Sequence, residues 1–136
     1  MLFRSLLLHG DTLCTDDADY QRFRAMVRDE RWQRDFLALP LAERRARIEQ
    51  LRASSEHEKQ GKPYEIMDVA ASSVSAAFRC HEVERMIHGH THRPARHPLE
   101  LGGRTCERWV LPEWTETGGG GYLACDAAGC RAVAFP

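Results

Sequence analysis

Short apolar runs and longer amphipathic segments alternate along the chain, and this pattern predicts an α/β fold. Residues 2–8 are apolar almost throughout, which predicts a strand inside a sheet with both faces covered. A second short apolar run predicts another strand at residues 86–88. Most of the chain between these two strands has a helical pattern, so the strands are expected to be joined through helices.

Helical periodicity accounts for three segments of the intervening chain. Residues 20–37 carry an apolar stripe and predict one helix, which follows a polar loop at residues 11–19 rich in helix N-cap residues. The proline at position 40 suits the start of a second helix, from residue 41 to residue 54 or beyond. These two helices predict a helical hairpin, and a third helix is expected at residues 68–79.

Beyond position 94 the pattern changes to short strands separated by glycine-rich turns. Strands are expected at residues 97–101, 108–111, 122–125 and 132–135. We interpret them as an antiparallel set that closes one edge of the sheet.

Composition restricts the chain to a few broad classes. Its 136 residues, 43% of them hydrophobic and 29% charged, are typical of one globular domain at most. A net charge of −1 provides no global field for binding nucleic acid. No apolar run approaches the ~20 residues needed to span a bilayer. The five scattered cysteines are expected to be free thiols in a reducing cytosol, and a metal clip formed by Cys125 and Cys130 is the less favoured alternative.

Three of the seven histidines fall within five consecutive positions, at His88, His90 and His92. Imidazoles two positions apart on an extended or turning backbone can point to one side, where they suit a borderline divalent metal. Gly89 allows the backbone to turn tightly and to approach a bound group. A solvated, histidine-rich loop is the alternative that this stretch leaves open.

A similar design occurs near the start of the chain. There an apolar run ends at Leu8 and is followed by His9, Gly10 and the carboxylate of Asp11. Open α/β sheets build their sites from residues at the C-terminal ends of strands. Two such strand ends predict a single site at one edge of the sheet, although His9 taken alone is equally compatible with a histidine packed on the core.

The predicted helical hairpin is strongly basic. Between residues 20 and 52 it contains nine arginines and five acidic residues. A solvated helix face explains such a charge run, and the alternatives are a basic cover over an anionic substrate or a surface that rests on anionic lipid. The tip of the hairpin also holds more apolar side chains than a solvated tip needs, namely Trp32, Phe36, Leu37, Leu39 and Leu41.

The only two lysines, Lys59 and Lys62, follow the second predicted helix, close to a pair of serines. Two mobile ammonium groups three positions apart suit the binding of a phosphate. An exposed, lysine-rich helix end is the competing interpretation, and the spacing alone favours it.

Several motifs spread along the chain form a combination that points to one enzyme family. They are His-Gly-Asp-Thr-Leu-Cys-Thr-Asp-Asp at residues 9–17, Tyr20, the arginine-rich hairpin, Ile-Met-Asp-Val at residues 66–69, and Ile-His-Gly-His-Thr-His-Arg-Pro at residues 87–94. Together they resemble the UDP-2,3-diacylglucosamine hydrolase family of calcineurin-like metallophosphoesterases. The run at residues 9–17 is specific to this branch, whereas Gly-His-x-His alone indicates only the superfamily.

The resemblance implies a fold, an activity and a location. The implied fold is part of a four-layer αββα sandwich, a single domain over residues 1–136 in which residues 20–62 form an inserted helical hairpin lid. The implied activity is manganese-dependent hydrolysis of the pyrophosphate of UDP-2,3-diacylglucosamine to UMP and 2,3-diacylglucosamine 1-phosphate in lipid A biosynthesis. The implied location is cytoplasmic, peripheral on the inner membrane, with the lipid-linked UDP-sugar and the anionic membrane surface as partners. Neither nucleic acid nor an obligate protein partner is expected.

The same resemblance assigns roles to individual residues. The implied metal ligands, for a site of two manganese ions, are His9, His90 and His92, and His90 is also implied to be catalytic and to contact the substrate. His88 is expected to be structural. The remaining implied substrate-binding residues are Asp17, Tyr20, Arg52, Ser55, Lys59 and Lys62.

The family also has site motifs that this chain lacks. Its Asp-x-His, Gly-Asp and Gly-Asn-x-Asp motifs precede the His-Gly-Asp motif and supply further metal ligands. We therefore expect the chain to be the C-terminal portion of such an enzyme, with the N-terminal half missing, and to be inactive alone. Pro112-Glu113 also stands where the family pattern has Gly-Asp, a milder change in a turn.

Three alternatives to a hydrolase of this family stay open. One is a non-catalytic module that binds a lipid phosphate or a nucleotide through the lysines and the hairpin. Another is a mononuclear metal-binding or scaffold protein that uses the three histidines. The last is another metallophosphoesterase that acts on a different phosphoester.

Overall fold

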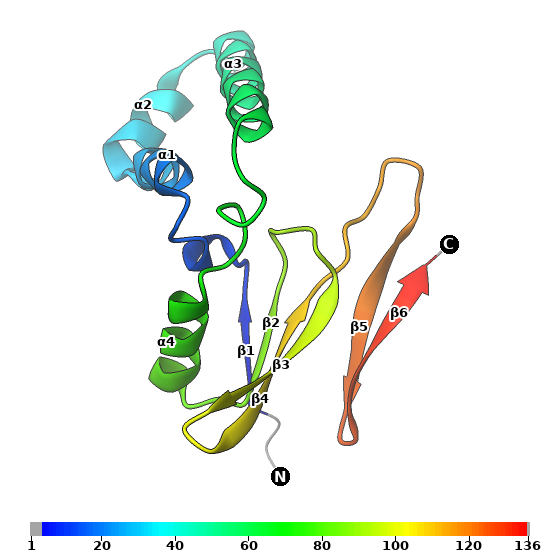
Figure 1. Cartoon of the computed structure of the whole chain (residues 1–136). Coiled ribbons are helices and arrows are strands. Elements are labelled where there is room, and N and C mark those ends of the chain that lie inside the picture. The colour runs from blue at the N-terminus through cyan, green and yellow to red at the C-terminus, as the bar shows by residue number, and fades with distance from the viewer. Residues whose placement is uncertain (1–3, 136) are drawn as a thin grey trace. The chain divides into compact units, whose positions relative to one another are not determined.

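The computed structural model describes residues 4–135 and divides the chain into two compact units. The sheet unit consists of Met1–Leu13 and Val69–Pro136, and the helical unit consists of Cys14–Asp68. Helices and strands occur in the α/β order that the sequence predicts (Figure 1).

A four-stranded mixed sheet forms the centre of the sheet unit. β1 and β2 run parallel, β4 runs parallel to β2, and β3 pairs antiparallel with β4. Leu8 is the register partner of His88, so β1 and β2 end at the same edge of the sheet. In spatial order the strands are β1 (Ser5–Leu8), β2 (Arg85–His88), β4 (Arg104–Val110) and β3 (Ala95–Leu101).

Within the described residues, β1 pairs with β2 alone and lies at the edge of this sheet, so the predicted interior position, which needs a flanking strand from the half expected to be missing, stays a prediction. Residues 2 and 3 of the predicted strand lie outside the described part of the chain, and the strand itself begins at Ser5. Leu6 and Leu8 pack against the core, whereas the side chain between them, Leu7, is 71% exposed. Side chains of a strand alternate between its two faces, so an unbroken apolar run does not guarantee that both faces are covered.

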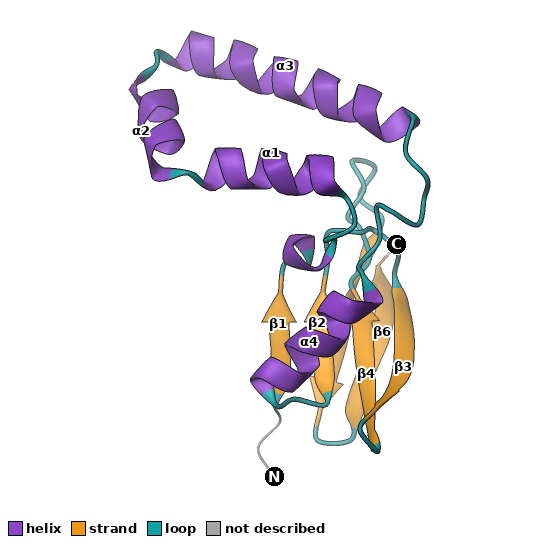
Figure 2. Cartoon of the chain, turned by 60° about the vertical axis from the view of Figure 1, so that its left-hand side comes forward, coloured by secondary structure: helices purple, strands orange, loops and turns teal. Residues whose placement is uncertain are grey.

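The core of the sheet unit lies between the sheet and α4 (Ala71–His81), which crosses one face of the sheet (Figure 2). Phe78 of α4 and Met86 of β2 are fully buried. The helix begins at Ala71, three residues later than predicted, because Ala70 is extended and its N–H donates to the carbonyl of Leu13 (2.9 Å). Other members of the buried cluster are Leu13, Val74, Val83 and Cys106.

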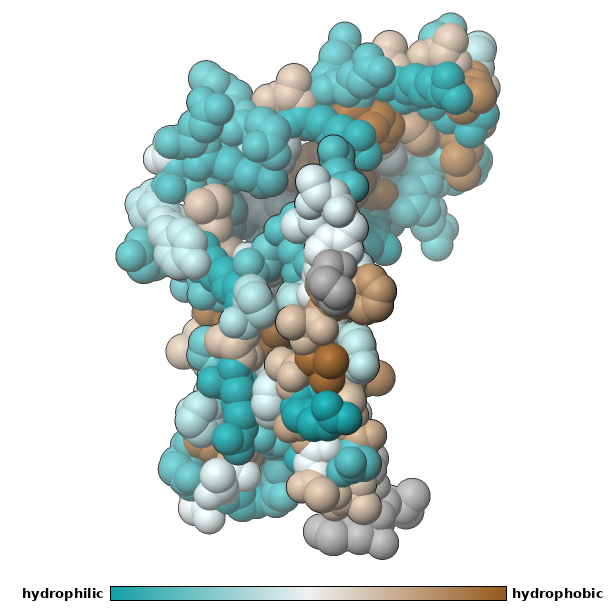
Figure 3. All heavy atoms as spheres, turned by 90° about the vertical axis from the view of Figure 1, so that its right-hand side faces the viewer, coloured by the Kyte–Doolittle hydropathy of each residue, from teal (hydrophilic) through white to brown (hydrophobic). Residues whose placement is uncertain are grey.

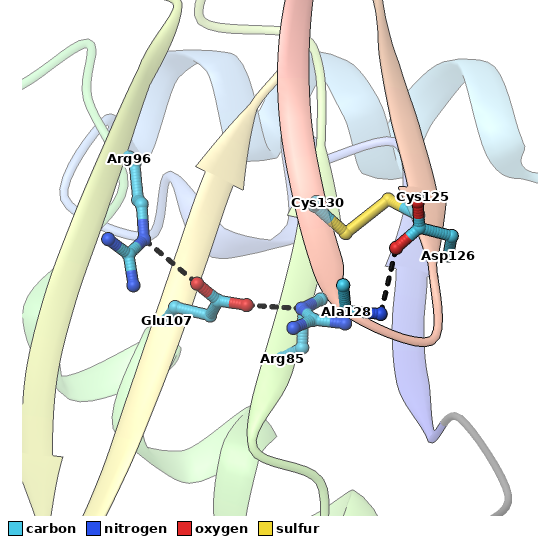
Figure 4. Close-up of a disulfide and its surroundings, with 7 residues drawn as sticks. All are labelled: Arg85, Arg96, Glu107, Cys125, Asp126, Ala128 and Cys130. Carbon is cyan, nitrogen blue, oxygen red and sulfur yellow. Dashed lines mark hydrogen bonds and ion pairs between the residues drawn. A yellow bond between two sulfur atoms is a disulfide. The ribbon is translucent and has the colours of Figure 1, made fainter.

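Charged side chains connect three strands on the opposite face of the sheet. Glu107 of β4 pairs with Arg85 of β2 and with Arg96 of β3, whose Nε lies 2.9 Å from Glu107 Oε2 (Figure 4). Burial alone would raise the pKa of Glu107, but the two guanidinium groups outweigh it and lower this pKa below the usual range. The carboxylate is therefore ionised well below neutral pH and ties the strands together.

The last two strands, β5 (Gly120–Asp126) and β6 (Gly129–Phe135), form a two-stranded sheet of their own. The prediction of one antiparallel set that closes the main sheet is therefore wrong: among the described residues, only β3 and β4 contribute to it. Cys125 and Cys130 are register partners near the turn and form a disulfide (Figure 4). This corrects the expectation that all five cysteines are free thiols.

The helical unit contains three helices where the sequence pattern predicted two. They are α1 (Ala18–Arg28), α2 (Glu30–Ala38) and α3 (Leu41–Gln60). The break falls at Asp29, whose backbone is extended and whose carboxylate accepts hydrogen bonds from the N–H groups of Arg31 and Trp32 (3.0 Å each). Asp29 thus ends α1 and caps α2, a choice that the apolar stripe did not reveal.

The surface of the helical unit is mixed in character. Hydrophilic residues cover most of it in the view of Figure 3, with apolar residues among them. Its exposed large apolar side chains include Leu37 and Leu41, on either side of Pro40. No helix in the described part of the chain has the length and apolar character that crossing a membrane requires.

We expect reduction of the Cys125–Cys130 disulfide to loosen the β5–β6 hairpin, because a two-stranded sheet that pairs with no other strand is only marginally stable. A disulfide that closes so short a loop contributes about 2 kcal/mol. Amide hydrogen exchange in β5 and β6 should therefore become roughly thirtyfold faster with a dithiol reductant, whereas β2 and β4 should change little. Mass spectrometry of peptides measures both rates. The Cys80→Ser variant controls for the exposed thiol, and equal exchange in both redox states would contradict the prediction.

Candidate functional site

Two histidines meet at the edge where β1 and β2 end. His9 follows β1 and His90 follows β2, and their ring centroids lie 4.9 Å apart with planes tilted by 56°. The N–H of Gly89 donates to the carbonyl of His9 (3.0 Å), which extends the parallel pairing by one step beyond the strands. The predicted convergence of the two strand ends is therefore confirmed.

The loop after β2 has a backbone that L-residues rarely adopt. His90 and His92 have φ angles of 67° and 54°, in the left-handed region. Such conformations persist only where the surrounding structure enforces them, and they concentrate at functional sites. Here Gly89 accepts a hydrogen bond from the N–H of Thr91 (2.8 Å), and the N–H of Leu111 donates to the carbonyl of His88 (2.8 Å). The loop is thus fixed to the ends of β2 and β4.

Gly10 is required where the two loops touch. Its φ is 110°, and a Cβ atom at this position would lie 2.7 Å from Nδ1 of His88 and 3.0 Å from the carbonyl oxygen of Gly89. Any side chain would therefore push the two strand ends apart. This explains why a glycine follows His9.

Carboxylates contact Nδ1 of two of the histidines. Asp11 Oδ1 lies 3.0 Å from Nδ1 of His9, and Glu113 Oε2 lies 2.9 Å from Nδ1 of His92. Asp11 is buried, whereas Glu113 and His92 are each about half exposed. A neutral imidazole that donates from Nδ1 keeps its lone pair on Nε2, the nitrogen then suited to bind a metal.

His88 has a different environment from the other histidines of this edge. It is fully buried, its Nδ1 donates to the carbonyl of Gly89 (2.8 Å), and its Nε2 accepts from Nη1 of Arg108 (2.9 Å). Because a guanidinium can only donate, the contact with Arg108 occupies the lone pair that a ligand would need. The structure thus agrees with the expectation that His88 is structural.

The donor chemistry at this edge suits a divalent metal, but the described residues do not complete a site. Neutral imidazoles with a carboxylate on the second nitrogen are common metal ligands. Within residues 4–135, however, no group of three or more histidine, cysteine, aspartate or glutamate side chains converges closely enough to hold an ion. The ligand roles of His9, His90 and His92 therefore stay predictions, and a complete site would need further donors.

The predicted substrate-binding residues other than His90 all lie in the helical unit, and three of them are in contact. Asp17 caps α1, with Oδ1 accepting from the N–H of Tyr20 (3.0 Å) and from Nζ of Lys62 (2.6 Å). Nζ of Lys62 also lies 3.4 Å from Asp19. The structure thereby ties the beginning of α1 to Lys62, two residues beyond the end of α3.

The other predicted residues of this group lie along α3. Arg52 is exposed and Ser55 is half-buried. Lys59 is also exposed, and its Nζ lies 2.9 Å from the carboxylate of Glu56. Their spacing on α3 is compatible with a shared surface, since positions three and four apart are neighbours on a helix. Their substrate-binding roles stay predictions.

A cleft of about 770 Å³ lies beside the sheet, on the side that carries Arg85, Arg96 and Glu107. It is lined by the residues that begin β2, by Glu107 and Trp109 of β4, and by the turn of the β5–β6 hairpin. Its size would suit a small molecule, but none of the predicted site residues lines it. The cleft and the histidines are therefore separate features of the sheet unit.

Sequence reasoning missed two residues that contact the histidines. Asp11 follows His9 by two positions, and its carboxylate was noted only as part of the strand-end motif. Glu113 was treated as a departure from the family pattern in a turn, yet it reaches His92 because β4 ends beside β2. Only the order of the strands could have signalled this contact.

Comparison with known proteins links the chain to one group of enzymes, although no family model matches it. It is 52% identical over 132 residues to a UDP-2,3-diacylglucosamine hydrolase of Bordetella parapertussis. The matched segment covers 94% of this chain and 51% of the relative. Proteins of the same name from Aromatoleum aromaticum and Stenotrophomonas maltophilia are 53% and 50% identical, each over 91% of this chain. The chain spans about half the length of these curated relatives, as a C-terminal portion would.

We expect the ion pair between Lys62 and Asp17 to stabilise the helical unit up to alkaline pH. Burial alone would lower the pKa of Lys62, but the hydrogen bonds and charges of Asp17 and Asp19 outweigh it and raise this pKa above 10.5. The contribution is therefore complete below pH 10.5 and is lost as the pH rises through the higher folded-state value. Chemical denaturation should show that Lys62→Met costs about 1.5–3 kcal/mol at neutral pH.

The pH dependence distinguishes this ion pair from general alkaline unfolding. The Lys62→Met variant should lose less stability than the unsubstituted chain when the pH is raised above 10.5, since it has no ammonium group to deprotonate at this site. Lys59→Met is the matched control, because Lys59 forms only an exposed pair within α3. Equal effects of the two substitutions would rule out a special role for Lys62.

Proposed function

We propose that this chain forms the C-terminal half of a UDP-2,3-diacylglucosamine hydrolase, which cleaves the pyrophosphate bond of its substrate to give UMP and 2,3-diacylglucosamine 1-phosphate in lipid A biosynthesis. The observation that carries this proposal is the identity of about half of all residues with proteins of that name, across nearly the whole chain. The meeting of His9 and His90 at one sheet edge supports it, because the relevant histidine motifs are then brought together by the fold.

The intact enzyme is proposed to be a four-layer αββα metallophosphoesterase with two manganese ions. An imidazole nitrogen would come from each of His9, His90 and His92. Donors other than these three histidines would complete the site. Manganese bound there would supply a Lewis acid that stabilises charge on the phosphoryl oxygens. Within this chain, the hydrogen bonds of Gly89 and Leu111 hold the histidine loop in place for that task.

The helical unit is proposed to act as a lid that binds the diacylglucosamine phosphate portion of the substrate. Lys62 could bind a phosphate while it remains paired with Asp17, because an ammonium group has three donors. Lys59, Arg52 and Ser55 would add polar contacts from α3. The exposed Leu37 and Leu41 provide apolar surface suited to acyl chains.

The same surface supports a proposal for location. α1, α2 and α3 carry many arginines, and Leu37 and Leu41 are exposed. Basic helices with exposed apolar side chains bind anionic lipid surfaces. We infer that the protein works in the cytoplasm, peripherally on the inner membrane, with the lipid-linked UDP-sugar as its substrate.

A non-catalytic binding module is the alternative that a specific observation favours. The described residues do not complete a metal site, whereas the contacts of Lys62 and the basic helices are present. Such a module would bind 2,3-diacylglucosamine 1-phosphate without releasing UMP. Another metallophosphoesterase activity would instead show as manganese-dependent hydrolysis of a different phosphoester.

A chimera tests the proposed activity directly. The half of the Bordetella parapertussis relative that this chain matches would be replaced by this chain, and UMP release from UDP-2,3-diacylglucosamine would be measured with manganese. We expect manganese-dependent turnover by the chimera, and a loss of about 10²-fold or more in its His90→Ala variant, since a metal ligand and substrate contact is removed.

The matched control for this loss is His81→Ala, which removes an exposed histidine at the end of α4, away from the loop after β2. Its activity should stay within about twofold of the unsubstituted chimera. A folded chimera that binds the lipid product without releasing UMP would replace the hydrolase proposal by the binding module.

Membrane binding forms a separate prediction. The full chain should sediment with vesicles that contain anionic lipid and much less with zwitterionic ones, and binding should weaken as salt is raised. Replacing Leu37 and Leu41 by serine should weaken binding about tenfold, because each loses apolar area that the bilayer would bury. Leu7→Ser, at an exposed leucine of the sheet unit, is the control. Equal binding to both vesicle types would exclude the proposed surface.

A further inference from the structure

We propose that Asp11 and Glu113 are positioning residues of the histidine edge, each holding Nδ1 of one imidazole so that Nε2 is presented as the metal-binding nitrogen. The inference deepens the proposed function and rests on it, since a metal must bind at this edge for the positioning to matter. It assigns roles to two carboxylates, Asp11 for His9 and Glu113 for His92.

The contact between Asp11 and His9 is built into the fold. Asp11 is 5% exposed and begins a short 3₁₀ turn, Asp11–Leu13, directly after the glycine that the strand ends require. A buried carboxylate is costly unless it is hydrogen-bonded, so its position is strongly constrained. The ring of His9 is by contrast about two-thirds exposed. A fixed acceptor thus orients an accessible imidazole, whose neighbour is His90 at 4.9 Å.

The contact between Glu113 and His92 is made by the chain that leaves β4. Val110 ends β4 as the register partner of His88, and the hydrogen bond from Leu111 to His88 carries the chain alongside the histidine loop. Glu113 then lies 2.9 Å from His92, a residue with left-handed backbone. An ion pair this exposed contributes little to stability. The contact with His92, whose backbone is strained, therefore points to a role in orienting this imidazole. Carboxylates that contact metal-bound histidines have that role.

His88 differs from His9 and His92 in what its two ring nitrogens contact. It also donates from Nδ1, but to a backbone carbonyl, and its Nε2 is taken by Arg108. The structure thus separates one histidine with both nitrogens committed to the interior from two whose Nδ1 meets a carboxylate. That sorting would be unnecessary if the stretch were only a solvated, histidine-rich loop.

The first experiment reads the tautomers without any metal. Long-range ¹H–¹⁵N NMR of the full chain, at mildly alkaline pH, should show His9 and His92 with the proton on Nδ1, whereas an exposed histidine such as His81 should carry it on Nε2. Asp11→Ala should shift His9 alone to the Nε2–H form, and Glu113→Ala should shift His92 alone, so that each variant controls for the other. His88 should keep its tautomer in both and serve as the reference for an intact fold.

Conservative variants keep the test decisive if Asp11→Ala fails to fold. Asp11→Asn and Glu113→Gln retain an oxygen acceptor, so both should retain the Nδ1–H tautomer. The second readout is manganese affinity, measured by electron paramagnetic resonance on the chimera described above. We expect the alanine variants to bind manganese about 10–100-fold more weakly and the amide variants to lose much less.

The outcomes separate this inference from the proposed function. Nε2–H tautomers of His9 and His92 in the unsubstituted chain, or a manganese affinity that neither alanine variant changes, would overturn the positioning roles. If the affinity responds as expected but the chimera never releases UMP, the hydrolase proposal fails while the positioning roles hold. If UMP is released but the manganese affinity does not respond to either alanine variant, the positioning roles fail while the hydrolase proposal holds.

Discussion

The parallel pairing of β1 with β2 is the constraint on which the rest of the structure depends. Leu8 and His88 are register partners although they lie far apart in the sequence, so the residues that follow them leave the sheet at the same edge. An antiparallel pairing would place His9 and His90 at opposite ends of the sheet. The burial of Met86 in one cluster with Phe78 of α4 fixes this register, because a shift of β2 by one residue would turn its core side outward.

The histidine edge combines a rigid base with a strained loop. Gly10 and the buried His88 bring the two strand ends into close contact, and hydrogen bonds to Gly89 hold the turn beyond them. His90 and His92 adopt left-handed backbone that an isolated loop would avoid. The core of the sheet unit thus supplies the free energy that keeps this loop in place, and the carboxylates beside it give the imidazoles a defined orientation.

Two other parts of the chain depend less on that core. The helical unit is stabilised by its own caps, by Asp29 between α1 and α2, and by the contact of Lys62 with Asp17. The β5–β6 hairpin relies on strand pairing, on the Cys125–Cys130 disulfide, and on the packing of Trp114 against Phe135 (5.5 Å between ring centroids). Among the residues that the structure describes, neither part has a buried cluster like that between α4 and the sheet, so local interactions carry a larger share of their stability.

The sequence by itself determined the α/β pattern, the two strand ends that carry histidine and glycine, and the basic helical segment, because each depends on neighbours within a few positions. Tertiary structure decided what local pattern cannot express. The sheet order left Leu7 exposed and brought Glu113 to His92, and the turn after β5 placed Cys125 opposite Cys130. The physical reason is that each outcome depends on which residues strand pairing and register place opposite one another, and the apolar and polar pattern of a single segment does not specify its partner.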